Sequence, residues 1–303
     1  MSAHAISVVI TGGAGFLGAA LARRILAAGS LAIDGAEPRP VERVTLLDLA
    51  PPPADLAADP RVHSLAGDLL QTVPSLPDVD VILHLAGVVS SAAEADYDLG
   101  MRVNLDALRA VIERARAMTV APVLVFTSSP AVFGADPAIG PVGEVDDDTL
   151  PRPQSSYGIQ KFIGEQLVAD AARRGCVRGR TARLMTVSGR PGAPAAAASC
   201  FPSAPSPEPI AGVRAVCPVD PDTPVALSSP TRTLDGILRA AAVSTAEWGS
   251  TTAMTLPALS TTPREMAEAL DRVAGAGTSD LIDWQRDAAI EAIVGSWPSQ
   301  FRT

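Results

Sequence analysis

A glycine-spaced turn joins a strand-like run to an amphipathic stretch near the start of the sequence. Residues 6–11 (ISVVIT) are rich in β-branched residues, and residues 15–29 (GFLGAALARRILAAG) carry apolar residues at helical spacing. Gly12, Gly15 and Gly18 lie at this junction. The first glycine permits a tight turn, the second lets the backbone approach a pyrophosphate, and the third lets helix and strand pack closely. A phosphate would then meet the positive end of the helix.

Strand-like and helical patterns alternate through the first half of the chain. Further strand-like runs occur at 44–48, 61–67, 80–87, 122–129 and 181–187, with helical patterns at about 98–118 and 156–174. Strands this continuously apolar, separated by helices, indicate a parallel sheet covered on both faces. The sequence therefore predicts an α/β fold, with a doubly wound parallel sheet of the Rossmann type over residues 1–188.

The composition changes after Val187. Residues 188–230 are crowded with Pro, Ala and Ser, which predicts little regular structure. A low-complexity linker and a loop that covers a substrate are both open interpretations. Helical patterns return at 231–243 and 263–274, with a short strand-like run at 253–257 between them. We expect residues 189–303 to form mainly a smaller C-terminal substrate-binding domain, with about 225–260 returning to the core.

Charge and cysteine content restrict the partners and the compartment. A formal net charge of −9 argues against nucleic acid, whose binding requires clustered Lys and Arg. The chain has no uninterrupted apolar run of about 18 residues, so no membrane span is expected. Its 3 cysteines are an odd number without metal-site spacing, which predicts no metal site and thiols in a reducing compartment. A cytoplasmic protein is the expectation.

Acidic and small residues follow the strands where a dinucleotide would lie. Asp48 ends the second long strand, where its carboxylate could accept hydrogen bonds from the adenosine ribose and repel a 2′-phosphate, which favours NAD. Asp68 could bind the adenine amino group, with Leu69 against the ring. Simple caps for Asp48 and Asp68, and a simple turn at Gly87, remain open. The expected cofactor-contacting set is completed by Phe16, Leu17, Ala86 and Gly87.

The segment SSYGIQKF (155–162) contains Tyr157 and Lys161, four residues apart at the start of a helix and so on one face. Lys161 is the chain's only lysine, since every other member of its 24 Lys and Arg residues is arginine. An ammonium group stabilises a nearby phenolate, so Tyr157 could accept a hydroxyl proton. The slim side chain of Lys161 also fits into a space that the planar guanidinium group of an arginine cannot occupy. Ser129 or Ser128, at the end of the preceding strand, could orient the substrate oxygen.

These motifs resemble, in order, those of the extended short-chain dehydrogenase/reductase family, also described as the NAD-dependent epimerase/dehydratase family. The matching segments are TGGAGFLG, GDLL, HLAG, RVNLDAL, SSPAVFG and YGIQK. The resemblance implies that Tyr157 is the catalytic acid/base and that Lys161 binds the nicotinamide ribose and lowers the tyrosine pKa. It also implies that Ser129 positions the substrate and that Asn104 takes part in the proton relay or in local structure. A homodimer is usual in the family.

The substrate must be argued from the second half. Relatives that act on nucleotide sugars usually carry an asparagine and a tyrosine after the sixth strand, and RLMTVSGRPGAP has neither. Segments such as AVCPVDPDT and IVGSWPSQF resemble a branch that oxidises a four-carbon sugar acid, D-erythronate, with NAD. A sugar carboxylate needs a cation, for which Arg190 and Arg232 are candidates, while Arg183 is expected to be structural. Pairing of each arginine with acidic groups alone is equally open. Ser90 could contact substrate hydroxyls.

The function expected from these residues is NAD-dependent oxidation of the 2-hydroxyl of a small, D-erythronate-like sugar acid to the 2-oxo acid. A nucleotide-sugar epimerase or dehydratase with tightly bound NAD is the first alternative. A non-catalytic NAD sensor on the same fold is the second, although sensors typically lose the Tyr-Lys pair.

Overall fold

The computed structural model describes residues 4–136, 138–189, 207–249 and 253–302. Its centre is a sheet in which the strands are ordered β12-β8-β6-β5-β1-β3, with β2 and β4 both paired to β3. All of these pairings are parallel except that of β2 with β3. The strands are β1 (Ile6–Thr11), β2 (Ser30–Leu31), β3 (Arg39–Asp48), β4 (Val62–Ala66), β5 (Val81–His84), β6 (Val123–Ser128), β8 (Arg178–Arg183) and β12 (Met254–Thr255).

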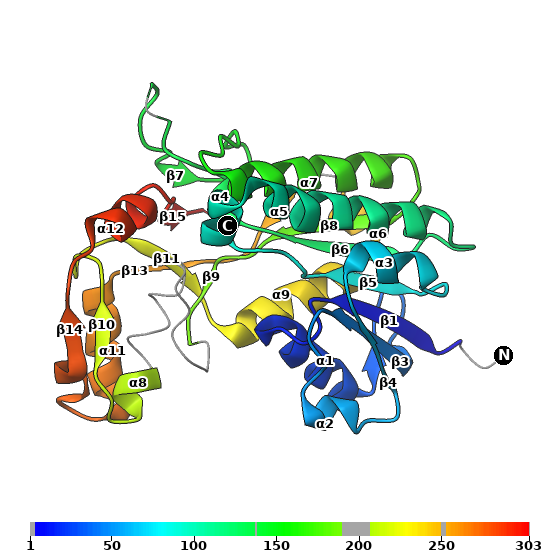
Figure 1. Ribbon diagram of the computed structural model, residues 1–303, viewed down its shortest axis with the longest axis horizontal. Helices are drawn as coiled ribbons and strands as arrows, with labels where there is room; N and C mark the ends of the chain where they lie inside the picture. The colour runs from blue at the N-terminus through cyan, green and yellow to red at the C-terminus, as the bar shows by residue number, and fades with distance from the viewer. Residues whose placement is uncertain (1–3, 137, 190–206, 250–252, 303) are drawn as a thin grey trace.

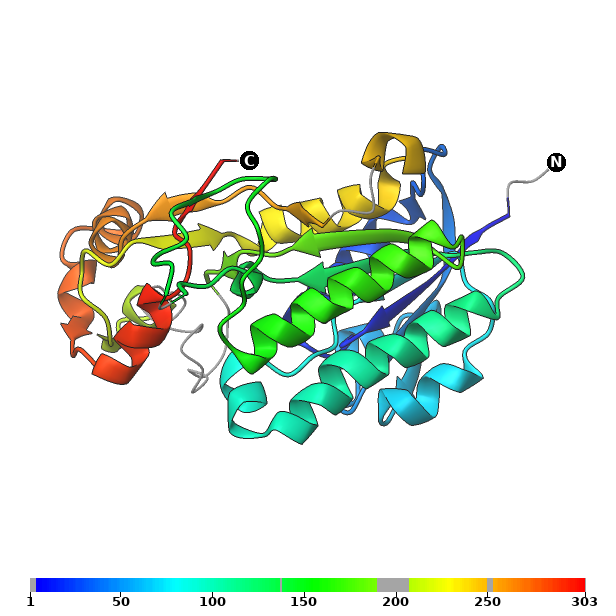
Figure 2. The same cartoon turned by 90° about the horizontal axis from the view of Figure 1, so that it is seen from above.

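Helices cover both faces of this sheet (Figures 1 and 2). On one face, α1 (Phe16–Ala28) and α9 (Pro230–Ala242) bury Ile25 and Ile237 against the strands. On the other, α3 (Leu69–Thr72), α6 (Ala107–Arg116) and α7 (Ser156–Arg173) bury side chains such as Val111 and Val168. The short α2 (Ala54–Ala57) follows β3. The α/β, doubly wound parallel fold predicted from the sequence is confirmed.

The strand expected at 181–187 is divided in the structure. β8 begins earlier, at Arg178, and β9 (Thr186–Val187) leaves the central sheet to pair with β11 (Val225–Ser228). The first residues of β8 include two arginines, so a search for apolar runs does not detect the start of this strand. Arg178 and Arg180 lie near Asp34, which accepts hydrogen bonds from both at 2.9 and 3.0 Å. Because Asp34 pairs with them, two arginines can begin a buried strand.

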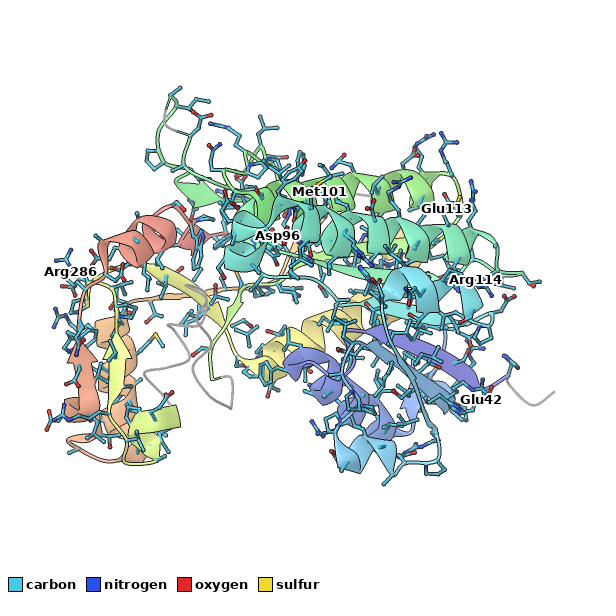
Figure 3. The ribbon with its side chains drawn as sticks, viewed as in Figure 1. Glu42, Asp96, Met101, Glu113, Arg114 and Arg286 are labelled. Carbon is cyan, nitrogen blue, oxygen red and sulfur yellow. The ribbon has the colours of Figure 1, made fainter. Side chains whose placement is uncertain are left out.

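The segment after β9 contains more regular structure than the Pro/Ala/Ser composition predicts. Within 207–230 that prediction was wrong at β10 (Ala215–Cys217) and β11, whose apolar side chains join a separate hydrophobic cluster with Leu270 and Ile282. The other elements of this region are α8 (Pro207–Ile210), α10 (Thr245–Trp248), β13 (Leu259–Thr261), α11 (Pro263–Ala274), β14 (Ile282–Trp284) and α12 (Ala288–Gly295). Arg286 marks this region in Figure 3, far from Arg114 on α6. The domain boundary at 188 stays a prediction.

The last described strand returns to the central sheet's side of the molecule. β15 (Gln300–Phe301) pairs in parallel with β7 (Glu144–Val145), and the Arg302 amide donates to the Val145 carbonyl at 2.8 Å. Phe301 packs on a small cluster that contains Val132 and Phe133, directly after β6. The chain's final segment is thus fixed beside the residues that follow Ser129.

Two further findings concern the environment of the chain. Among the described helices, none is both long enough and apolar enough to span a membrane. Cys176 and Cys217 are free thiols.

Candidate active site

A cavity of about 1200 Å³ opens at the carboxyl ends of β1, β3, β5 and β6. It runs from the glycine-rich turn to β9, β11 and the segment after α12, where Thr186, Ala226 and Trp297 line its far wall. Parallel sheets place their ligands at this edge. The volume exceeds the range of about 300–1,000 Å³ usual for small-molecule sites, which leaves room for a dinucleotide and a second molecule.

The glycine turn fits a dinucleotide phosphate. Gly12 has φ +71° and its amide donates to the Leu47 carbonyl at 2.8 Å; an added Cβ would lie 3.0 Å from the Ala86 nitrogen. A Cβ on Gly18 would lie 2.1 Å from the Gly12 carbonyl oxygen, so only glycine lets α1 start this close to the turn. Gly15, Phe16 and Leu17 begin α1 and line the cavity. These residues form a cradle that matches the predicted cofactor site.

Two predicted cofactor carboxylates already have partners. Asp48 ends β3 and accepts hydrogen bonds from the amides of Ala14, at 3.0 Å, and Ala50, at 3.2 Å. Asp68 accepts from the Leu70 amide at 2.9 Å, which caps α3, and pairs with Arg102. Both still line the cavity, as does Leu69. Asp48 therefore links the end of β3 to the glycine turn, while Asp68 functions at least as a helix cap.

The loop after β5 is held by Asn104. This residue lies in a π-helical segment, η2 (Met101–Asp106), which follows α4 (Ser90–Ala95) and α5 (Tyr97–Gly100). Its Oδ1 accepts from the Val88 amide at 2.9 Å, and its Nδ2 donates to the Val88 carbonyl at 3.2 Å. Ala86 and Gly87 line the cavity beside it. Short π segments often occur at functional sites, and this one turns a buried amide toward the loop.

The structure brings Ser129, Tyr157 and Lys161 to one wall of the cavity. Ser129 follows β6, and its Oγ accepts from the Ala131 amide at 3.2 Å. Ser128 is directed elsewhere, since its Oγ donates to Glu165 at 2.6 Å. Of the two serines left open by the sequence, Ser129 is thus the one whose hydroxyl is not taken up by Glu165, and it lines the cavity together with Tyr157.

Lys161 is fixed in a buried position beneath Tyr157. Its side chain is 4% exposed, and its Nζ donates to the Thr127 carbonyl at 2.9 Å. The same nitrogen lies 4.9 Å from the ring centroid of Phe126 and 5.6 Å from that of Tyr157. It approaches the loop after β5 as well, because a Cβ on Gly87 would be 3.5 Å away. The ammonium group occupies a narrow space between a carbonyl and two aromatic rings.

The pKa values at this pair differ from the expectation that Lys161 lowers that of Tyr157. Burial raises the pKa of Tyr157 to about 12, against a smaller opposing effect of the Ser129 hydrogen bond. Burial also lowers the pKa of Lys161 to about 8, although the nearby Glu165 carboxylate raises it. Desolvation disfavours the charged form of both groups. Burial therefore favours the neutral form of each group.

The predicted substrate contacts are placed unevenly. Ser90 lines the cavity at the start of α4. Arg190 lies outside the described residues. Arg232 is exposed near the start of α9, and the structure does not bring it to the described cavity wall. Arg183 donates two hydrogen bonds to Glu165, at 2.8 and 2.7 Å, in a buried ion pair, in keeping with the structural role expected for it.

Sequence reasoning missed a buried polar chain under the cavity floor. His84 ends β5, is 1% exposed, and its Nδ1 lies 2.8 Å from Thr11 Oγ1. Thr127 Oγ1 donates to the His84 carbonyl at 3.1 Å, and Thr127 in turn binds Lys161 through its own carbonyl. The sequence does hint at this polar chain, because Thr11, His84 and Thr127 are polar residues at the ends of otherwise apolar strands. Burial lowers the pKa of His84 to about 3, with the charge of Lys161 as a second cause.

The depressed pKa of His84 predicts acid sensitivity. Between pH 6.5 and 5 the unfolded chain binds a proton at His84 that the folded chain excludes, so stability is lost as the pH falls. Over this window the free energy of unfolding should drop by about 1.5 kcal/mol. Urea titrations followed by circular dichroism would measure it, and His84→Asn should flatten the dependence. An unchanged wild-type free energy of unfolding between these pH values would contradict the prediction.

A parallel sheet whose carboxyl edge joins a glycine cradle to a Ser-Tyr-Lys wall defines a dinucleotide-binding α/β protein. The chain belongs to the NAD dependent epimerase/dehydratase family, whose profile matches residues 8–203. The resemblance read from the sequence motifs is confirmed, and this family uses a nicotinamide dinucleotide, which the cradle fits.

Among curated proteins, the chain is similar to two D-erythronate dehydrogenases. That of Cupriavidus necator is 47% identical over 298 residues, which cover 97% of this chain and 90% of the relative. That of Haemophilus influenzae is 37% identical, covering 97% and 91%. Among solved structures, one titled a nucleoside-diphosphate-sugar epimerase from Agrobacterium tumefaciens has a TM-score of 0.89 at 36% identity, covering 98% and 87%. An L-threonine dehydrogenase from Clostridium difficile, at 20% identity and TM-score 0.82, shares the fold.

Proposed function

We propose that this chain is an NAD-dependent dehydrogenase that oxidises the 2-hydroxyl of a four-carbon sugar acid of the D-erythronate type to the 2-oxo acid. The main support for the substrate is the 47% identity to a D-erythronate dehydrogenase, because it extends over 97% of the chain. The similarity therefore includes the segments that line the far wall of the cavity, among them those with Thr186 and Trp297. Support for the chemistry is the wall that Ser129, Tyr157 and Lys161 share with the glycine cradle.

Each residue of this wall has a role in the proposed reaction. Bound NAD would supply the acceptor for the hydride that leaves carbon 2 of the sugar acid. Tyr157 accepts the proton of the 2-hydroxyl, so the carbon–oxygen bond becomes a carbonyl. Ser129, which lines the cavity together with Tyr157, holds the substrate oxygen next to the tyrosine hydroxyl. Lys161 supplies positive charge below the tyrosine ring and donors for the nicotinamide ribose.

NAD is preferred over NADP in this proposal because of Asp48. Its carboxylate lies at the end of β3 and is fixed there by the amides of Ala14 and Ala50. At this point of the fold an acidic residue binds the ribose hydroxyls and repels a 2′-phosphate. Asp68 and Leu69, which follow β4 and line the same cavity, are proposed to contact the adenine.

The test is a cofactor and substrate panel read by absorbance of the reduced nicotinamide. NAD with D-erythronate should give reduction, with L-erythronate and the two threonate isomers slower, and NADP in place of NAD should be poorer. The product should be trapped as a 2-oxo acid by a hydrazine reagent. Reduction by none of these sugar acids would reject the proposed substrate.

A nucleotide-sugar epimerase is the second candidate, favoured by the name of the solved structure that is 36% identical. In such an enzyme the cofactor is reduced and reoxidised within one cycle, so no NADH accumulates. Conversion of UDP-sugars or dTDP-sugars without net NADH would support it. Net NADH from a sugar acid would exclude it.

We also propose a homodimer formed through the α5 and α7 surface. Tyr97 and Leu99 on α5 and Ile159 and Ile163 on α7 are exposed apolar side chains, and the two helices contact each other. Light scattering should give the mass of a dimer, and Ile163→Glu should lower it to that of a monomer. A monomeric wild-type protein at micromolar concentration would contradict this assembly.

A further inference from the structure

Gln160 is a buried polar residue that the mechanism above does not use. It immediately precedes Lys161 in α7 and is 1% exposed. A buried amide is costly unless its polar atoms find partners. Its Oε1 accepts a hydrogen bond of 2.7 Å from Asn104 Nδ2, the shortest of the contacts that the Asn104 amide makes. The residue therefore joins the helix of Tyr157 and Lys161 to the π-helical segment η2.

The same Asn104 amide is also hydrogen-bonded to the loop after β5. Its Oδ1 and Nδ2 bind the amide and the carbonyl of Val88, which is a two-point grip on the backbone. The grip requires one orientation of the amide, with oxygen toward the Val88 amide. Gln160 supplies a second acceptor for Nδ2 and so favours that orientation. Gly87 lies against it, since an added Cβ would be 2.9 Å from Asn104 Oδ1.

The surroundings are shaped to a glutamine at this position. A Cβ on Gly100 would lie 2.5 Å from Gln160 Nε2, so a glycine at the end of α5 leaves the space for the amide. Within the described part of the chain, Nε2 has no hydrogen-bond partner. The Gln160 amide thus leaves its Nε2 donor without a partner while its Oε1 accepts from Asn104. A residue that served only to fill space would not need this polar group.

We propose that Gln160 is a positioning residue for the cofactor. By holding the Asn104 amide in one orientation, it fixes the Gly87–Val88 loop relative to Tyr157 and Lys161 on its own helix, α7. That loop forms the cavity wall beside Lys161, where the nicotinamide half of a dinucleotide would lie. This inference rests on one part of the proposed function, namely that the cavity binds the cofactor. A freed loop would have to be ordered again on binding, which weakens affinity.

The test measures NADH binding by calorimetry, which does not depend on the identity of the sugar acid. Gln160→Met keeps the length but removes the acceptor, and should raise the Kd for NADH roughly 5- to 30-fold, the value of one or two lost hydrogen bonds. Gln160→Glu restores an acceptor and should give a Kd for NADH below that of Gln160→Met. Should Gln160→Met fail to fold, Gln160→Asn, which is too short to reach Asn104, replaces it.

A double-mutant cycle separates positioning from general destabilisation. In an Asn104→Ala background, Gln160→Met should add less than about twofold to the Kd, because the residue acts through Asn104. Val168→Ala, a buried position on the same helix, is the control and should lower the unfolding midpoint with an unchanged Kd. An unchanged Kd in the single variant, or additive effects in the double variant, would overturn the inference. Absence of sugar-acid oxidation with tight NADH binding would refute only the proposed substrate.

Discussion

Tyr157→Phe is expected to lower NAD reduction by about 10²- to 10⁴-fold, the usual contribution of a positioned acid/base. The phenyl ring fills the same space above Lys161 but has no hydroxyl to receive the substrate proton. NADH affinity should stay close to wild type, since the glycine cradle and Lys161 are intact. Initial rates at saturating substrate and calorimetric binding of NADH would measure the two effects.

The pH dependence of the wild type adds a check on the same residue. Burial raises the pKa of Tyr157 to about 12, so the phenolate becomes more abundant as the pH rises. Activity should therefore increase from pH 7 toward pH 8, before loss of the Lys161 charge near its pKa of about 8 opposes the rise. Tyr157→Phe should remove the ascending limb. A variant with near wild-type turnover would remove Tyr157 from the mechanism.

Lys161→Arg should lower kcat/KM by about 10²-fold even though the charge is kept, which is the loss that a displacement of about 1 Å can cause. The Lys161 ammonium is 4% exposed and lies between the Thr127 carbonyl and the rings of Phe126 and Tyr157. A planar guanidinium is broader and would shift the tyrosine or the Gly87 loop.

The matched control is Arg173→Lys, the reverse exchange at the exposed end of the same helix, where Arg173 pairs with Asp170. It should leave kcat/KM within about twofold, because exposed ion pairs contribute little. Steady-state kinetics with varied NAD would separate lost affinity from lost turnover. If Lys161→Arg were as active as the control variant, the explanation for this single lysine would be wrong.

Many strands of the first half could be predicted because a strand that is buried on both faces of the sheet is a continuous run of apolar residues. The run at 6–11 is β1, and the run at 122–129 contains β6, whose six residues are all buried. The glycine spacing also predicted a tight turn at the start of α1, where the turn and the close packing require glycine; that this turn holds a cofactor stays a prediction.

The elements that the sequence did not predict depend on distant contacts. Arg180 can be buried in β8 because Asp34, far along the chain, accepts its hydrogen bond. β11 lies in a segment with unfavourable composition but gains partners on both sides, β9 and β13. The helical pattern at 98–118 gave no sign of the π-helical segment that turns Asn104 toward Val88.

The sequence could predict which candidate residues lie together where a single helix or strand end positions them. Tyr157 and Lys161 share a face of α7, and Ser129 follows β6, so local spacing brought them together. Arg232 is exposed near the start of α9 and is not among the residues that line the described cavity, so its contact with a substrate stays a prediction. Gln160 and Glu165 could not be recognised from spacing, since their partners, Asn104 and Arg183, come from other elements.

In the proposed reaction the hydride at carbon 2 of the sugar acid passes to NAD while Tyr157 receives the hydroxyl proton. D-Erythronate carrying deuterium at carbon 2 tests it directly, with the mass of the reduced cofactor as the readout. We predict NADH that carries one deuterium, formed together with an unlabelled 2-oxo acid. Unlabelled NADH would mean that another carbon is oxidised, and no NADH at all would mean that this sugar acid is not the substrate.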